Sequence, residues 1–122
     1  MRISYSLGSL LTIDEVLVCA KILEKHSPDT IWIPETWGME NFTMLSAVSQ
    51  KNNYSKIGSS IINIFSRSPS LIAMGAATID VISNGRLVIG LGTSSETIVE
   101  DFHGNNFKSP VSRMKEYVEI IK

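Results

Sequence analysis

A chain of 122 residues with 43% hydrophobic and 19% charged residues is expected to fold as one domain, and this composition excludes a disordered protein. Its net charge is −1 with both signs scattered, which argues against a nucleic-acid-binding protein. Cys19 is the single cysteine, so an internal disulfide is impossible and a cytoplasmic location is expected. The amino-terminal stretch lacks the pattern of a signal peptide, and no apolar run is long enough to span a bilayer.

The first half of the chain has the pattern of two βα units. Strands are expected over residues 2–7 and 30–34, and helices over residues 13–26 and 41–50. Thr12 and Glu15 are three residues apart and predict a capping box at the start of the first helix. The side chain of Asn41 is expected to cap the second helix.

The second half repeats the βα pattern twice. Strands are expected over residues 56–65 and 87–92, and helices over residues 69–83 and 110–122, with a short helix near 96–102. Ser68-Pro69 supplies a cap and a favourable first helical residue, and Ser109-Pro110 repeats that signal before the last helix. Arg86, at the amino end of the fourth strand, is expected to form a structural ion pair.

Strand starts recur at about 30 residues, which is the size of one βα unit. An open doubly wound sheet and a (β/α)₈ barrel both use this pattern, and a complete barrel needs about 250 residues. The last apolar helical pattern runs to Lys122 without a stop signal, so the sequence leaves open whether that residue is a natural end. We therefore predict an α/β fold in which residues 1–122 form a single partial domain, the first four βα units of a TIM-type barrel.

Four short motifs follow the third strand: Arg67-Ser68-Pro69, Ala73 to Asp80, Ser83 to Arg86, and Gly90-Leu91-Gly92. Together these motifs resemble the bacterial-luciferase-like superfamily of (β/α)₈ barrels. The superfamily contains FMN-dependent monooxygenases and coenzyme F420-dependent reductases. The third strand and the Lys108-to-Ser112 entry to the last helix look most like methylenetetrahydromethanopterin reductase, an F420-dependent enzyme.

This resemblance implies a cofactor site at the carboxyl ends of the strands, where barrel enzymes place their sites. It implies a cis peptide bond between Ser60 and Ile61 behind the deazaflavin ring, with Asn63 beside the ring edge. The implied cofactor-binding residues are Thr36, Ser60, Ile61, Asn63, Gly92, Thr93 and Ser94.

The chain departs from the resemblance after the second strand. Many relatives carry an acidic residue followed by His, and this chain has Glu35 followed by Thr36. Glu35 is therefore expected to be the catalytic acid, provided that burial raises its pKa. His103 lies in a polar loop placed to cover a substrate, although a solvated loop histidine is the commoner case. No group of residues has metal-ligand spacing, so no metal site is expected.

Three functional hypotheses follow. The first is an F420-dependent oxidoreductase, or its amino-terminal part, that transfers a hydride between F420 and a C1-carrying pterin. The second is an FMN-dependent luciferase-like monooxygenase. The third is an inactive half-barrel that pairs with itself or with a complementary chain, because the first and fourth strands would have bare edges. A small-molecule substrate and a homo-oligomer or paired half-barrel are expected, with no nucleic-acid or membrane partner.

Overall fold

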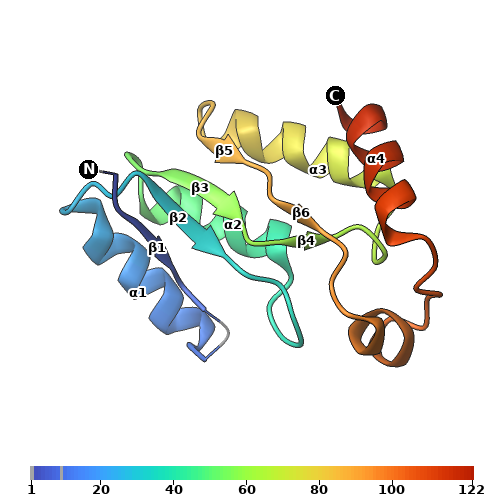
Figure 1. Cartoon of the computed structure of the whole chain (residues 1–122). Coiled ribbons are helices and arrows are strands. Elements are labelled where there is room, and N and C mark those ends of the chain that lie inside the picture. Colours follow the sequence, from blue (N-terminus) through green and yellow to red (C-terminus); the bar gives the residue numbers. More distant parts are fainter. Residues whose placement is uncertain (1, 9) are drawn as a thin grey trace.

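The computed structural model describes residues 2–8 and 10–122, and it shows helices alternating with parallel strands (Figure 1). The elements in chain order are β1 (Ser4–Ser6), α1 (Ile13–Glu24), β2 (Thr30–Ile33), α2 (Asn41–Lys51), β3 (Lys56–Ser59), β4 (Ile62–Asn63), α3 (Pro69–Ile82), β5 (Leu87–Val88), β6 (Leu91–Gly92), the π-helical turn η1 (Ile98–Phe102) and α4 (Pro110–Ile121). The predicted alternation of four βα units is confirmed, with α1 ending two residues before the expected position.

The strands form a four-stranded sheet in the order β1-β2-β3-β5, in which every pair is parallel. Two shorter strands, β4 and β6, pair parallel to each other and prolong β3 and β5. Because the sheet is parallel, the carboxyl ends of all its strands meet at one edge. The loops after β2, β4 and β6 therefore gather there (Figure 1).

The third and fourth strands were predicted as continuous, and each is interrupted in the structure. The third breaks between Ser59 and Ile62, at a cis peptide bond between Ser60 and Ile61. The fourth breaks opposite, at Ile89 and Gly90. The Ser59 hydroxyl bridges the gap, because its Oγ donates to the Gly90 carbonyl at 3.0 Å and accepts from the Gly90 amide at 2.8 Å. The Ser59 side chain thus satisfies the Gly90 amide, while the Gly90 carbonyl also accepts from the Ile62 amide at 2.8 Å.

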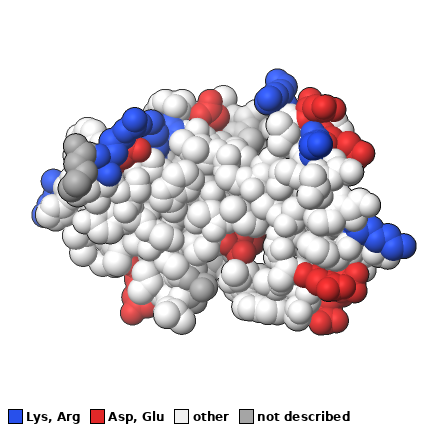
Figure 2. All heavy atoms as spheres, viewed as in Figure 1, with Lys and Arg blue, Asp and Glu red and all other residues white. Residues whose placement is uncertain are grey.

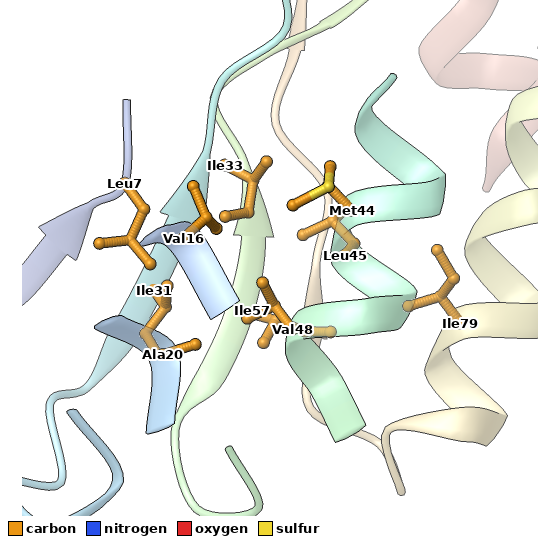
Figure 3. Packing of buried hydrophobic residues seen from close by; sticks show 10 residues of the cluster. All are labelled: Leu7, Val16, Ala20, Ile31, Ile33, Met44, Leu45, Val48, Ile57 and Ile79. Carbon is orange, nitrogen blue, oxygen red and sulfur yellow. The ribbon is translucent and has the colours of Figure 1, made fainter. Parts of the chain in front are cut away.

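Two hydrophobic clusters hold the layers together. The first lies between the main sheet and the helices, and Figure 3 shows its members pointing toward one another: Leu7, Val16, Ala20, Ile31, Ile33, Met44, Leu45, Val48, Ile57 and Ile79. The second lies beneath β4 and β6 and contains Ile62, Ile64, Phe65, Ile72, Val99 and Tyr117. Val99 belongs to η1 and is fully buried, so this cluster fixes the segment after β6 to the rest of the domain.

The predicted helix caps are confirmed at two positions and wrong at two others. The Thr12–Glu15 capping box is present, and Ser68 caps α3 by accepting a hydrogen bond from the Leu71 amide. The prediction for α2 was wrong, because Glu40 is its N-cap and Asn41 is its first residue. The prediction for Ser109 was also wrong. It has φ 47°, in the left-handed region, and its side chain makes no capping hydrogen bond.

Arg86 is structural, but the expected ion pair was wrong. Its guanidinium donates to the backbone carbonyls of Ser83, Asn52, Ser55 and Ser49, at 2.6–3.1 Å. Burial lowers the pKa of the Arg86 guanidinium, since no carboxylate offsets the loss of water. The arginine therefore ties the start of β5 to the loop between α2 and β3 through neutral oxygen atoms.

No helix among residues 2–8 and 10–122 has both the length and the apolar character needed to cross a bilayer.

Gly90→Ala is expected to lower the free energy of unfolding by about 3 kcal/mol or more, because overpacking a rigid site is costly. A Cβ at this position would lie 2.2 Å from the backbone oxygen of Ser59, which cannot rotate away. Gly8→Ala is the matched control, since its Cβ would meet no heavy atom within 4 Å. Urea unfolding of both variants measures the difference, and equal effects would contradict the close approach seen here.

Candidate functional site at the carboxyl ends of the strands

A cavity of about 260 Å³ opens between the β2–α2 loop and the segment that follows β6. Its lining includes Glu35, Thr36, Trp37, Glu40, Arg67 and His103. Figure 2 shows that the middle of this face is almost free of charged residues, except for acidic atoms at a hollow in its lower half. Most of the other charged atoms on this face lie at its periphery.

Arg67, which follows β4, is the centre of the charged group. Its Nη1 donates to Oε2 of Glu35 at 2.8 Å and its Nη2 donates to Oε1 of Glu35 at 2.6 Å, a bidentate pair. Nη2 also donates to Glu40, and the guanidinium lies 5.5 Å from the centre of the Phe42 ring. The side chains of Arg67 and Glu35 are only 12% and 11% exposed, so this pair is shielded from water.

Glu35 accepts backbone hydrogen bonds in addition to those from Arg67. The amide of Asn41 donates to Oε1 at 3.1 Å, and the amide of Asn63 donates to Oε2 at 3.4 Å. One carboxylate thereby joins the end of β2, the start of α2 and the end of β4. Both oxygens are occupied, an arrangement that suits a group positioning its neighbours. The prediction that Glu35 acts as a catalytic acid stays a prediction.

The network shifts the pKa of two of its members. The hydrogen bonds from Arg67 to Glu35 raise the pKa of the Arg67 guanidinium, against an opposing effect of burial. Burial raises the pKa of Glu40, but hydrogen bonds from Thr43, Arg67 and Phe42 outweigh it and hold that pKa below the ordinary 4.5. The local electrostatics therefore favour the charged state of both groups.

Most of the predicted cofactor residues lie together beside this network. Asn63 and Gly92 are partners in the β4–β6 pairing, and a Cβ at Gly92 would lie 2.5 Å from Cγ1 of Ile61. Ser60 precedes Ile61 across the cis bond, which the resemblance implied and the structure contains. The chain continues directly into Thr93 and Ser94, which are half-buried. Thr36 lines the adjacent cavity, and the Glu35–Asn63 hydrogen bond links the two groups.

Asn63 carries a hydrogen-bonding group that the protein does not use. Its residue is 2% exposed, and its Oδ1 accepts from the Phe65 amide at 2.9 Å. Its Nδ2 has no hydrogen-bond partner among the described residues. A buried donor without a partner is costly, and in native proteins it calls for an explanation such as a functional role or an ordered water. Beside the closely approached backbone at Gly92, this donor fits a flat ligand that presents an acceptor atom at its edge.

Aromatic side chains form one rim of the cavity. The Trp37 and Phe102 rings meet edge to face with centroids 5.3 Å apart, and the His103 ring packs against Phe102 at 5.0 Å. This rim and the central role of Arg67 were missed by sequence reasoning. Arg67 stood in the Arg-Ser-Pro motif, but its two carboxylate partners lie 27 and 32 residues earlier in the chain. No spacing rule connects residues so far apart.

No three His, Cys, Asp or Glu side chains gather as a metal-binding group in the part of the chain that the structure describes.

Comparison with known families gives a match to the luciferase-like monooxygenase model over residues 2–122. The chain belongs to this luciferase-like family. The arrangement of its parallel strands and helices is accordingly the first part of the family's TIM-type barrel, as predicted.

Two curated relatives of this luciferase-like chain are more than 30% identical to it. One, assigned as a coenzyme F420-dependent oxidoreductase of Mycobacterium tuberculosis, is 35% identical over 94 residues, which cover 77% of this chain and 27% of the relative. A 5,10-methylenetetrahydromethanopterin reductase of Archaeoglobus fulgidus is 34% identical over 103 residues, which cover 84% and 31%. The matched region thus spans less than a third of either relative.

Solved structures of the luciferase-like family show the same fold. The monooxygenase RslO1 of Streptomyces bottropensis superposes with a TM-score of 0.89 at 18% identity, covering 99% of this chain and 42% of the other. The coenzyme F420 dependent tetrahydromethanopterin reductase of Methanopyrus kandleri gives 0.85 at 21% identity, covering 98% and 39%.

Glu40→Gln is expected to flatten the loss of thermal stability on acidification between about pH 5 and pH 3. The Glu40 pKa is lower in the folded than in the unfolded chain, so its carboxylate stabilises the fold above the unfolded pKa. That stabilisation is lost as the pH falls through the folded-state pKa. Thermal unfolding of the wild type and the variant across this range gives the test. A difference in melting temperature that stays constant with pH would contradict it.

Proposed function

We propose that this chain builds part of the cofactor site of an F420-dependent oxidoreductase that transfers a hydride between coenzyme F420 and a C1-carrying pterin such as methylenetetrahydromethanopterin. The observation that carries the proposal is the unpartnered Nδ2 of Asn63, buried at a strand end beside Gly92. The names of the two relatives described above support the choice of F420 and, for one of them, the pterin. A pterin reductase among the structural neighbours shares the fold.

Each proposed cofactor residue has a physical part to play. Gly92 lets the backbone of β6 pack directly against the Ile61 side chain, which fixes the position of Ile61 at the strand end. Asn63 donates a hydrogen bond to the ring edge, and Ser60 and Ile61 form the wall beside it. Thr93 and Ser94 offer hydroxyl groups just beyond the strand, and Thr36 offers one from the neighbouring loop. When bound, the deazaflavin supplies or accepts the hydride.

We assign Glu35 to the placement of this site. Its bonds to Arg67 and to the Asn63 amide hold the end of β4 against the β2–α2 loop. Movement of that strand end would displace Asn63 from the ring edge. In this proposal, loss of Glu35 acts on cofactor binding through Asn63, and a direct part in proton transfer would require one of its oxygens to leave Arg67.

FMN is the alternative cofactor, since the same strand-end surface suits an isoalloxazine ring. One structural neighbour, a Baeyer-Villiger monooxygenase of Pseudomonas putida in complex with FMN, has the same fold with a TM-score of 0.87 at 14% identity.

We propose a cytoplasmic location on the ground that Cys19 is the single cysteine.

The third hypothesis, an inactive half-barrel, rests on the edge strands. β1 has one neighbour in the sheet, and its Ile3–Tyr5 side is about half exposed. The fourth strand, β5 with β6, is the other edge. An apolar edge of this kind favours pairing with another chain. We propose a second copy or a complementary half-barrel as the partner of these edges, so oligomeric state belongs beside cofactor binding in any test.

Asn63→Ser is expected to weaken F420 binding about tenfold, the effect of losing roughly one hydrogen bond. A serine hydroxyl can still accept from the Phe65 amide, so the local turn is kept while the amide donor is lost. Fluorescence titration of the 122-residue chain with F420, and separately with FMN, measures the affinity and identifies the cofactor.

Asn52→Ser is the matched control for this experiment. Asn52 is also a fully buried amide, but its Nδ2 donates to the Ala20 carbonyl and its Oδ1 accepts from two backbone amides, away from the strand-end site. It should lower stability and leave the affinity for F420 unchanged. Equal affinities of the wild type and Asn63→Ser, or no binding of either cofactor, would refute the proposed site.

A further inference from the structure

The charged residues of the strand-end cavity are extensively hydrogen-bonded to one another. Nη1 of Arg67 donates to Glu35 and Ser66, and Nη2 donates to Glu35 and Glu40, so both terminal nitrogens use two hydrogen atoms each. Glu40 accepts in addition from the amides of Phe42 and Thr43 and from the Thr43 hydroxyl. A ligand that sought a bond to either terminal nitrogen of Arg67 would have to break an existing one.

Two polar side chains in the cavity lining are not engaged in this way. Among the described residues, neither the His103 imidazole nor the Thr36 hydroxyl has a hydrogen-bond partner, although both line the cavity. The His103 ring touches Phe102, which meets Trp37 across the rim. His103 is half-buried where it lines the cavity.

The segment that carries His103 is firmly attached. Val99, one turn earlier in η1, is fully buried in the second hydrophobic cluster. The Asn105 side chain donates to the Phe65 carbonyl at 3.0 Å, and the Phe107 ring packs on the Phe65 ring with centroids 5.1 Å apart. His103 is thus held between two anchors on the β4–α3 connection, the same connection that carries Arg67.

We propose that this cavity is the substrate pocket and that His103 is the catalytic residue that gives the substrate its proton. This inference rests on the proposed function, which brings the substrate to the strand ends. Reduction of the substrate adds one hydride to a carbon atom. The bond that is reduced or opened leaves its electron pair on a nitrogen or oxygen atom, and that atom takes up one proton. The reduced deazaflavin, when bound, would supply the hydride and its two electrons. The proton leaves a ring nitrogen of His103, and water restores it.

The composition of the pocket defines the class of substrate. Trp37 and Phe102 offer ring edges and faces, which suit a flat heterocycle. Glu35, Glu40 and Arg67 sum to one negative charge, and the Arg67 guanidinium is paired with both carboxylates. A substrate with a phosphate or carboxylate against this wall would be repelled. The pocket therefore takes the neutral, hydrogen-bonding ring system of a molecule such as a reduced pterin.

The decisive experiment uses the ring nitrogens of the two histidines as separate probes. His26 lies at the far end of the domain, lining a different cavity with Arg2, Tyr5 and Asp29, so it is an internal control. The 122-residue chain, labelled with ¹⁵N in the imidazole rings, is titrated with tetrahydrobiopterin as the pterin probe, and His26→Gln assigns the signals.

The expected result is a saturable shift of one His103 ring nitrogen, while the His26 signals stay in place. In His103→Ala the affinity for the pterin should fall about tenfold, the equivalent of one lost hydrogen bond. Where the holoenzyme turns over, His103→Gln should lower kcat at least about a hundredfold with KM changed by less than about threefold, because glutamine keeps a donor but cannot transfer a proton.

An unchanged His103 signal, or an equal shift of both histidines, would overturn the inference. So would a His103→Gln variant with the wild-type kcat. These outcomes are separate from those for the cofactor, since the pterin titration needs no F420. A chain that shifts His103 with pterin but binds neither F420 nor FMN would refute the proposed function and still support the pocket.

Discussion

The bidentate pair between Arg67 and Glu35 is the interaction on which the strand-end region depends. Arg67 follows β4 and Glu35 follows β2, so the pair joins the carboxyl ends of two strands that α2 separates in the sequence. Glu40 joins the same guanidinium while capping α2. A buried pair of this kind adds little net stability compared with apolar packing, but removing one partner would leave a shielded charge. Its main effect is therefore to fix geometry.

Close backbone approach is the second constraint, and it explains why glycines occur where the strands change direction. A Cβ at Gly90 would enter the Ser59 carbonyl, and one at Gly92 would enter the Ile61 side chain. At Gly58 the Trp32 ring occupies the space that a Cβ would need, at 2.4 Å. The third and fourth strands thus pack tightly at the end where Asn63 has its unpartnered donor. Close approach of the backbone at these glycines therefore shapes both the packing and the candidate site.

The sequence predicts the regular parts of this fold and not its long-range connections. Capping at Thr12 and Ser68 depends on residues three apart, and both were correctly predicted. The choice of Glu40 over Asn41 as cap could not be predicted locally, because the Asn41 side chain instead donates to the Ile33 carbonyl, eight residues earlier. The break in the third strand is stabilised by Ser59 and Gly90, which are 31 residues apart. The hydrophobic periodicity of the third strand predicts a continuous apolar strand and gives no sign of the break.

The hydrogen bonds among Glu35, Glu40 and Arg67 limit the chemistry that these charged groups can perform in the cavity. Reading acidic residues as proton donors is reasonable from sequence, since carboxylates at strand ends often serve catalysis. In the folded chain, however, Glu35 and Glu40 are the groups that orient Arg67 and cap α2. A side chain that holds its neighbours through every oxygen cannot also move freely to a substrate. In the proposals above, Asn63 on the cofactor side and His103 across the cavity are therefore the groups that meet a ligand.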